Sequence, residues 1–299
     1  MKILVYGAGV LGCNLAHQLH RSKKDVTLLA RNQWYETIQK NGLIIQNRIT
    51  HFRTKDKMKV VNRLEDEYDV IFVVVQNSQT AEVMRDLKNS TCKNIIFIGN
   101  NMHARECVFP DKNVLFGFYS AAGKRDKKEV CSFDMKKITI GNCNGTNTSD
   151  AFVKQLFVGT KIHYTICNQM DDYLKSHAAF ILPFAFASYH YGNSLGPLKK
   201  DSSYMQLMID ATIEMYDALM AEGDCILPKG DYEFAKQRTK YIKFAKTLST
   251  VPTLANICVC EHAKAGKKEM YSMKTAFEKM FSATGISAEN FEILCGSSK

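Results

Sequence analysis

The stretch that decides the fold is MKILVYGAGVLG, residues 1–12. An apolar segment suited to a β-strand, residues 2–6, leads directly into the pattern G-x-G-x-x-G, and apolar residues at helical spacing follow to residue 21. In such a turn the first glycine permits the tight bend, the second lets the backbone approach a pyrophosphate, and the third lets the helix pack closely. A glycine turn without a ligand is the alternative. We predict a dinucleotide-binding turn formed by Gly7, Ala8, Gly9, Val10, Leu11 and Gly12.

The first half of the chain alternates segments typical of strands and helices. After the opening unit, we expect strands at residues 25–29, 69–75, 94–98, 114–119, 137–141 and 161–166, and a β-rich hairpin within 42–61. Helices are expected at 32–40, 79–87 and 149–156. Alternation of this kind indicates a parallel α/β sheet. We therefore predict that residues 1–167 form a Rossmann dinucleotide-binding domain.

The second half has a different pattern, because no convincing strand follows Asn168. Helical periodicity predicts helices over residues 171–191, 203–222, 232–248, 254–263, 269–283 and 288–294. We therefore predict an α/β domain followed by an all-helical domain over residues 168–299. The apolar run at 178–187 is about half the length that crosses a bilayer, so it is expected to be a buried helix.

Composition narrows the class of protein. A chain of 299 residues suits two domains, and 45% hydrophobic with 23% charged residues excludes a disordered or fibrous chain. Ten cysteines are too dilute for a disulfide scaffold, and no signal peptide is recognisable, so we expect a cytoplasmic protein. Its net charge of +10 indicates anionic partners.

Three classes of partner are not expected. Basic runs such as residues 124–128 are interleaved with acids and lack aromatic residues for stacking, which argues against nucleic acid. No segment predicts a membrane contact. Cys258, Cys260 and His262 form one compact group, but ordinary packing explains it and no metal is predicted. The sequence leaves a homodimer open.

The end of the second predicted strand bears on the choice of dinucleotide. An NAD site usually has an acidic residue there, which binds the ribose 2′-hydroxyl. This chain has Leu29-Ala30-Arg31-Asn32, and the guanidinium of Arg31 suits a 2′-phosphate. A solvated loop arginine is the alternative. We predict NADP(H) as the cofactor.

Several motifs together resemble the ketopantoate reductase (2-dehydropantoate 2-reductase) family. They are the glycine turn, Arg31, GNNM at residues 99–102, YLK at 173–175 and ATGI at 283–286, in order along nearly the whole chain. The resemblance implies an NADPH-binding Rossmann domain and a helical domain like the C-terminal domain of 6-phosphogluconate dehydrogenase, with the active site in the cleft between them. It also implies reduction of a small anionic 2-keto acid to a 2-hydroxy acid, with ketopantoate and pantothenate biosynthesis as the first candidates.

The same resemblance assigns roles to individual residues. Lys175 stands at the position of the catalytic lysine, whose ammonium stabilises charge on the carbonyl oxygen and donates the proton. Glu269 matches a glutamate that helps to position the substrate or the lysine. Asn100 and Asn193 match substrate-binding asparagines, Asn100 also lying near the nicotinamide, and Gln76 replaces a lysine near the cofactor. Without the resemblance, these residues are a surface lysine, a first-turn acid and turn residues.

The sequence departs from the family in the expected substrate shell. Ala179 and Pro183 replace asparagines, and Ile257 replaces a serine. A site without these polar groups cannot use hydrogen bonds to discriminate between substrates. Two alternatives therefore stay open: the same fold reducing another 2-keto acid or an imine, and a non-catalytic NADP-binding sensor or regulator.

Overall fold

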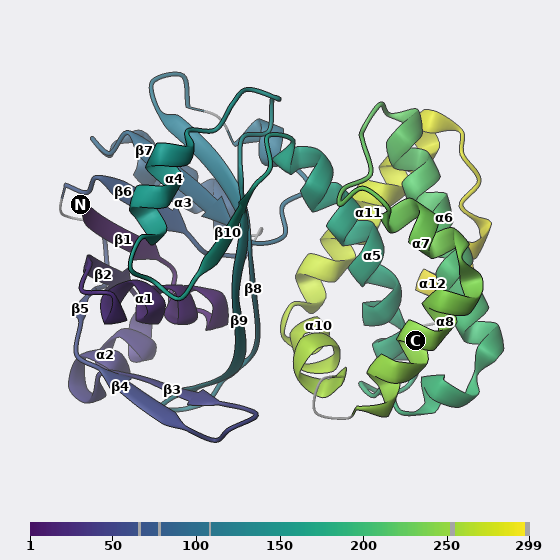
Figure 1. Ribbon diagram of the computed structural model, residues 1–299, viewed down its shortest axis with the longest axis horizontal. Helices are drawn as coiled ribbons and strands as arrows, with labels where there is room; N and C mark the ends of the chain where they lie inside the picture. Colours follow the sequence, from purple (N-terminus) through teal and green to yellow (C-terminus); the bar gives the residue numbers. More distant parts are fainter. Residues whose placement is uncertain (65–66, 77–78, 108, 252–254, 297–299) are drawn as a thin grey trace. The chain divides into compact units, whose positions relative to one another are not determined.

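A computed structural model of the chain describes residues 1–64, 67–76, 79–107, 109–251 and 255–296. The chain divides into two compact units, Met1–Asp171 and Asp172–Lys299. Figure 1 shows that the first unit contains all the labelled strands and the second is built of helices. The boundary lies four residues after the one expected from the sequence, inside one helix.

The first unit is built on a single mixed sheet. Its strands follow the order β4-β3-β9-β8-β7-β6-β1-β2-β5, and β10 also pairs with β9. From β8 to β5 along this order, adjacent strands pair in parallel. The strands are β1 (Lys2–Tyr6), β2 (Asp25–Leu29), β3 (Leu43–Asn47), β4 (Arg53–Asp56), β5 (Lys59–Val61), β6 (Val70–Val73), β7 (Asn94–Ile98), β8 (Asn113–Arg125), β9 (Val130–Gly141) and β10 (His163–Ile166).

The expected parallel pairing is wrong at β8 and β9, because these two strands form a long antiparallel ribbon. The antiparallel pair β3–β4 lies in the segment where a hairpin was expected. The prediction ended one strand at residue 119 and began the next at residue 137, because the polar segment between them reads as a charged loop. It is strand on both sides of a short turn, since Lys124 and Arg125 pair with Cys131 and Val130.

Helix α1 (Val10–Arg21) lies against widely separated parts of this sheet. It contacts β1 and β2 as well as β3, β8 and β9, so the sheet curls around the helix. Two polar side chains of α1 reach β9: Asn14 Oδ1 accepts a hydrogen bond from Ser132 Oγ at 3.0 Å, and Gln18 Nε2 donates to Asp134 at 2.9 Å. These buried hydrogen bonds fix the helix against the ribbon. The other helices of this unit are α2 (Asn32–Asn41), α3 (Thr80–Lys88), the short 3₁₀ turn Ala104–Glu106 and α4 (Asp150–Phe157).

The second unit is organised around α6 (Ser202–Ala221), which contacts α7, α8, α11 and α12. Ten of its side chains are buried, at spacings that place them on several faces, as expected for a central helix. The remaining elements are α5 (Met170–His190), the 3₁₀ turn Pro197–Lys200, α7 (Asp231–Lys236), α8 (Arg238–Thr250), the π-helical segment Asn256–Cys260, α10 (Glu261–Ala265), α11 (Lys267–Thr284) and α12 (Glu289–Gly296).

Two helices of this unit differ from the prediction. The single helix expected over 232–248 is two helices, because the backbone of Gln237 leaves the helical region at ψ 68° between α7 and α8. The helix expected over 254–263 is the π-helical segment followed by α10, and Leu254 lies outside the described residues. The spacing of apolar residues does not distinguish one continuous helix from two consecutive helices, because both arrangements keep one apolar face.

The apolar run at residues 178–187 lies within α5 and is largely buried, as predicted. Within the described ranges, the structure contains no helix with the length and apolar character needed to cross a membrane.

The carboxylate of Asp56, at the end of β4, is held by two basic residues of α1. One oxygen is 2.5 Å from His17 Nδ1 and the other is 2.7 Å from Arg21 Nε, and the Asp56 side chain is 2% exposed. Burial acts to raise the pKa of Asp56, but the hydrogen bond from His17 and the nearby positive charges outweigh it and hold the pKa below its usual value.

We expect Asp56→Asn to lower the free energy of unfolding at pH 7 by about 1.5–3 kcal/mol, the usual value of hydrogen bonds to a charged group. Because the folded-state pKa is depressed, this stabilisation is present above the unfolded-state pKa of about 4 and is lost as pH falls through the folded-state value. Urea unfolding at pH 7 and near pH 3 measures it. The difference between the two proteins should shrink in acid, whereas Asp111→Asn, which breaks an exposed pair with Lys93, should have little effect at either pH.

Candidate functional site

The turn between β1 and α1 requires glycine at two positions. Gly7 has a φ of 118°, and a Cβ there would lie 2.2 Å from the carbonyl oxygen of Val74. A Cβ on Gly12 would lie 1.9 Å from the carbonyl oxygen of Gly7. Both distances are far below any real contact, so these glycines allow the helix to start directly against the strand.

Gly9 is glycine for a different reason. It caps the N-terminus of α1 with an extended backbone that any residue adopts, and a Cβ there would have no atom within 4 Å. The first turn of the helix carries no acidic residue. An open position beside free helical N–H groups is what a pyrophosphate needs. Within the same motif, Ala8 is buried and Val10 and Leu11 pack against the core, so their side chains hold the turn in place.

Arg31 follows β2 and lies beside the first strand. Its Nη2 donates to the hydroxyl of Tyr6, whose ring the guanidinium also covers, and its Nη1 is 2.8 Å from Glu82 on α3. The hydroxyl of Tyr6 donates to Asp86 at 2.6 Å. Burial and this hydrogen bond raise the pKa of Tyr6 to about 12, so it stays protonated. The position of the Arg31 side chain is therefore fixed by these contacts. Any 2′-phosphate must compete with Glu82 for the guanidinium of Arg31.

Asn100 and Gln76 follow neighbouring parallel strands. Asn100 comes two residues after β7, and its Oδ1 is buried without a hydrogen-bond partner within the described part of the chain. Gln76 comes after β6 and is exposed. Because β7, β6, β1 and β2 are adjacent and parallel, Asn100, Gln76, the glycine turn and Arg31 share the carboxyl edge of the sheet. Open α/β sheets bind ligands at this edge.

In the second unit, Lys175 lies in the second turn of α5 and forms an ion pair that sequence reasoning missed. Its Nζ donates to Asp224 Oδ2 at 2.8 Å, and the two side chains are 13% and 5% exposed. Asp224 follows the helix-ending Gly223 and precedes Cys225-Ile226-Leu227. The signal in the sequence was weak: an acid before an apolar segment, two residues after another acid, Glu222.

The structure places the other predicted residues of this unit as follows. Glu269 is in the first turn of α11 and is half-buried. Asn193 is exposed, with a φ of 66°, and its N–H donates to the carbonyl oxygen of Ser188 at the end of α5, a position that suits asparagine without a ligand. Ala179 and Ile257 are fully buried.

His177, two residues after Lys175, is a neutral side chain. Burial and the nearby His262 lower its pKa to about 4. At neutral pH an imidazole with this pKa is in its neutral form, which is too weak an acid to serve as the proton donor. This environment suits a packing role for His177.

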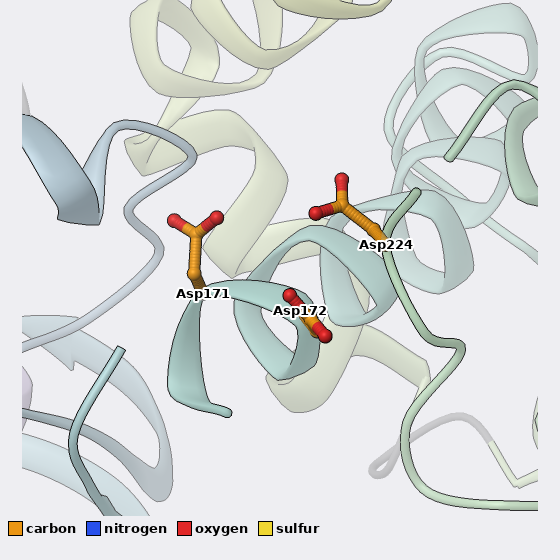
Figure 2. A group of neighbouring side chains, drawn as sticks. All are labelled: Asp171, Asp172 and Asp224. Atoms are coloured by element: carbon orange, nitrogen blue, oxygen red, sulfur yellow. The ribbon is translucent and has the colours of Figure 1, made fainter. Parts of the chain in front are cut away.

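Three carboxylates cluster around the start of α5. Asp171, Asp172 and Asp224 can each offer an oxygen within 4.8 Å of the others, and Figure 2 shows the first two on α5 and the third on the segment after α6. Each has a protein partner: Asp171 lies 2.9 Å from Arg105 Nε, Asp172 accepts from the N–H of Cys225, and Asp224 binds Lys175. These partners supply positive charge and hydrogen-bond donors to the three carboxylates.

Comparisons with known proteins agree with this architecture. Residues 3–145 match the family model of ketopantoate reductase PanE/ApbA. The match lies within the first unit, which thus carries a domain similar to ketopantoate reductase. The matched family is one of oxidoreductases, which agrees with a nicotinamide dinucleotide as cofactor. A curated relative from Bacillus subtilis (strain 168), the uncharacterized oxidoreductase YkpB, is 23% identical over 206 residues, or 66% of this chain and 68% of that protein.

Solved structures show the same fold over the whole chain. D-mandelate dehydrogenase, determined with NADH and anilino(oxo)acetate, has a TM-score of 0.80 at 15% identity, covering 100% of this chain and 97% of that one. A PanE/ApbA family ketopantoate reductase from Ralstonia eutropha JMP134 has a TM-score of 0.77 at 16% identity, covering 99% and 96%. The predicted combination of a Rossmann domain with a helical domain is confirmed.

We expect opposite effects when Gly9 and Gly12 are each changed to alanine. Gly9→Ala should leave the melting temperature unchanged, because its Cβ meets nothing, yet weaken dinucleotide binding roughly tenfold or more, about 1.4 kcal/mol, by blocking the approach of the pyrophosphate. Gly12→Ala should lower the melting temperature, because its Cβ collides with the carbonyl of Gly7.

Thermal melts followed by circular dichroism and fluorescence titrations with NADH and NADPH measure both effects. Unchanged dinucleotide affinity in Gly9→Ala would remove the glycine turn from the cofactor site.

Proposed function

We propose that this chain is an NAD(P)H-dependent reductase of 2-keto acids, with NADPH as the preferred cofactor and ketopantoate as the first candidate substrate. With that substrate the product is pantoate, and the protein serves pantothenate biosynthesis. The cofactor, when bound, supplies the hydride for the carbonyl carbon. The chain supplies the binding groups, the proton and the groups that orient them.

The observation that carries this proposal is the largely buried ammonium of Lys175, in a chain whose other unit matches the ketopantoate reductase family model. Hydride addition places negative charge on the carbonyl oxygen, and an ammonium both stabilises that charge and donates the proton. Lys175 is the proposed general acid. Glu269 is a proposed orienting group, and Asn193 a proposed substrate contact.

At the carboxyl edge of the sheet, the chain's own groups fit a dinucleotide. The N–H groups at the start of α1 suit the pyrophosphate, and the open side of Gly9 allows its approach. The buried Oδ1 of Asn100 has no hydrogen-bond partner among the described residues, so it can accept a hydrogen bond from the nicotinamide or the substrate. Gln76 is exposed at the same edge and is proposed as a further cofactor contact.

A specific observation favours a second candidate substrate, a 2-keto acid with an apolar side chain. Ala179, Pro183 and Ile257 offer no hydrogen bond where a hydroxyl-bearing substrate needs one. A structural relative, D-mandelate dehydrogenase, was determined with anilino(oxo)acetate, an aromatic compound with a 2-oxo carboxylate. An imine substrate needs the same proton donor. A non-catalytic sensor of NADP(H) is the remaining alternative, and any robust turnover excludes it.

The reaction is tested by following NADPH and NADH oxidation at 340 nm with ketopantoate, phenylglyoxylate, 2-ketoisovalerate and pyruvate. Lys175→Met keeps much of the side-chain volume and removes the ammonium, so we expect kcat to fall roughly 10²–10⁴-fold, the usual contribution of a general acid. Its affinity for NADPH should be unchanged. Lys199→Met, on an exposed lysine of the same unit, is the matched control.

Turnover that is unchanged in Lys175→Met would remove the proposed role of the lysine. Tight NADPH binding with no oxidation by the panel would favour the sensor.

Preference for NADPH is expected to depend on Arg31 and its competition with Glu82. Arg31→Ala should weaken NADPH binding roughly 10–100-fold, the loss of about 1.5–3 kcal/mol for a charge-assisted hydrogen bond, and leave NADH nearly unaffected. Glu82→Gln should strengthen NADPH binding, because it removes a negative charge 2.8 Å from the guanidinium of Arg31. Isothermal titration with both cofactors measures this. If Arg31→Ala changed the affinities for NADPH and NADH equally, Arg31 would not be a contact of the 2′-phosphate.

A further inference from the structure

The segment after α6 presents one carboxylate to Lys175. Asp224 Oδ2 and Lys175 Nζ are 2.8 Å apart, and their side chains are 5% and 13% exposed. Exposed ion pairs contribute little because water screens them, whereas at this degree of burial the attraction is much less screened. This contact therefore has a larger effect on the ammonium than a surface pair would have.

Hydrogen bonds on both sides of Lys175 hold this segment. The backbone of Asp224 donates to the carbonyl oxygen of Leu219 at the end of α6. Along α5, Asp172 accepts from the N–H of Cys225 at 3.2 Å, and Ser176 Oγ accepts from the N–H of Leu227 at 3.0 Å. Because Asp172 and Ser176 flank Lys175, the carboxylate of Asp224 is fixed relative to the helical turn that carries the lysine.

We infer that Asp224 is a positioning residue that orients the ε-ammonium of Lys175 and keeps it protonated. This inference rests on the proposed role of Lys175 as proton donor. A nearby negative charge of low exposure favours the charged form of an amine, and the hydrogen bond fixes the direction of Nζ. After the proton passes to the carbonyl oxygen, the neutral amine beside Asp224 regains a proton readily, which prepares the lysine for the next turnover.

Further carboxylates lie near this pair. Asp172 and Asp171 lie within 4.8 Å of Asp224 through their carboxylate oxygens, and Arg105 lies beside Asp171. Glu269 is the acid that the family resemblance assigns to the same lysine. Asp224 has the direct ion pair with Nζ described above, so its removal should change the protonation of Lys175.

Asp224→Asn keeps the size of the side chain and removes its charge. In the full-length protein with NADPH and the most active keto acid of the panel, we expect kcat at neutral pH to fall roughly 10–100-fold. The alkaline limb of the pH profile of kcat should move to lower pH by about one unit or more. KM for NADPH should be unchanged, and Asp224→Glu should restore part of the rate.

Two controls separate positioning from folding. Asp210→Asn removes a more exposed pair with Arg238 from α6 itself and should leave the pH profile unchanged. The double variant Lys175→Met/Asp224→Asn should be no slower than Lys175→Met alone, because Asp224 acts through the lysine. A pH profile of Asp224→Asn that matches the unaltered protein, or additive losses in the double variant, would overturn the inference.

A readout that needs no turnover distinguishes failure of this inference from failure of the proposed function. The lysines are reductively methylated with ¹³C, and the resonance of Lys175, identified by its absence in Lys175→Met, is followed against pH. The ammonium should lose its proton at lower pH in Asp224→Asn than in the unaltered protein. If no keto acid is turned over but this difference is present, the pairing stands and the proposed reaction fails. If the titration is the same in both proteins, the inference fails.

Discussion

The constraint on which the rest of the first unit depends is the lack of space between Gly7 and Gly12. A Cβ at position 12 would lie 1.9 Å from the carbonyl oxygen of Gly7, so α1 starts as close to β1 as two backbones can approach. That closeness fixes where the helix lies against the sheet. It also directs the N–H groups at the start of α1 toward the carboxyl edge, where the dinucleotide is proposed to bind.

The sheet then curls around α1, and polar groups on the helix are satisfied by strands far away in the sequence. Asn14 pairs with Ser132, Gln18 with Asp134, and His17 and Arg21 with Asp56. Buried polar groups that are fully paired make an arrangement specific, because each alternative packing leaves one unpaired. The net charge of +10 gives no information about these contacts, because Asp56 and Asp134 each have specific partners on α1.

The candidate site shows how much the sequence could predict. The glycine turn and the place of Arg31 followed from local spacing, since strand, turn and helix are adjacent in the chain. The partner of Lys175 could not be found in this way, because 49 residues separate it from Asp224. Glu82 beside Arg31 was missed for the same reason, as it lies on α3, 51 residues later. The polar half of the β8–β9 ribbon reads as a loop because strand pairing, not composition, makes it a strand.

The sequence by itself determined the glycine turn after the first strand and the change from strands to helices near residue 168. These features depend on residues close together in the chain, where spacing reports geometry directly. Only the tertiary structure decided that the sheet is mixed and curled, that Glu82 competes for Arg31, and that Asp224 is paired with Lys175. Each of these depends on contacts between distant segments, which form only when burial of the apolar faces brings those segments together.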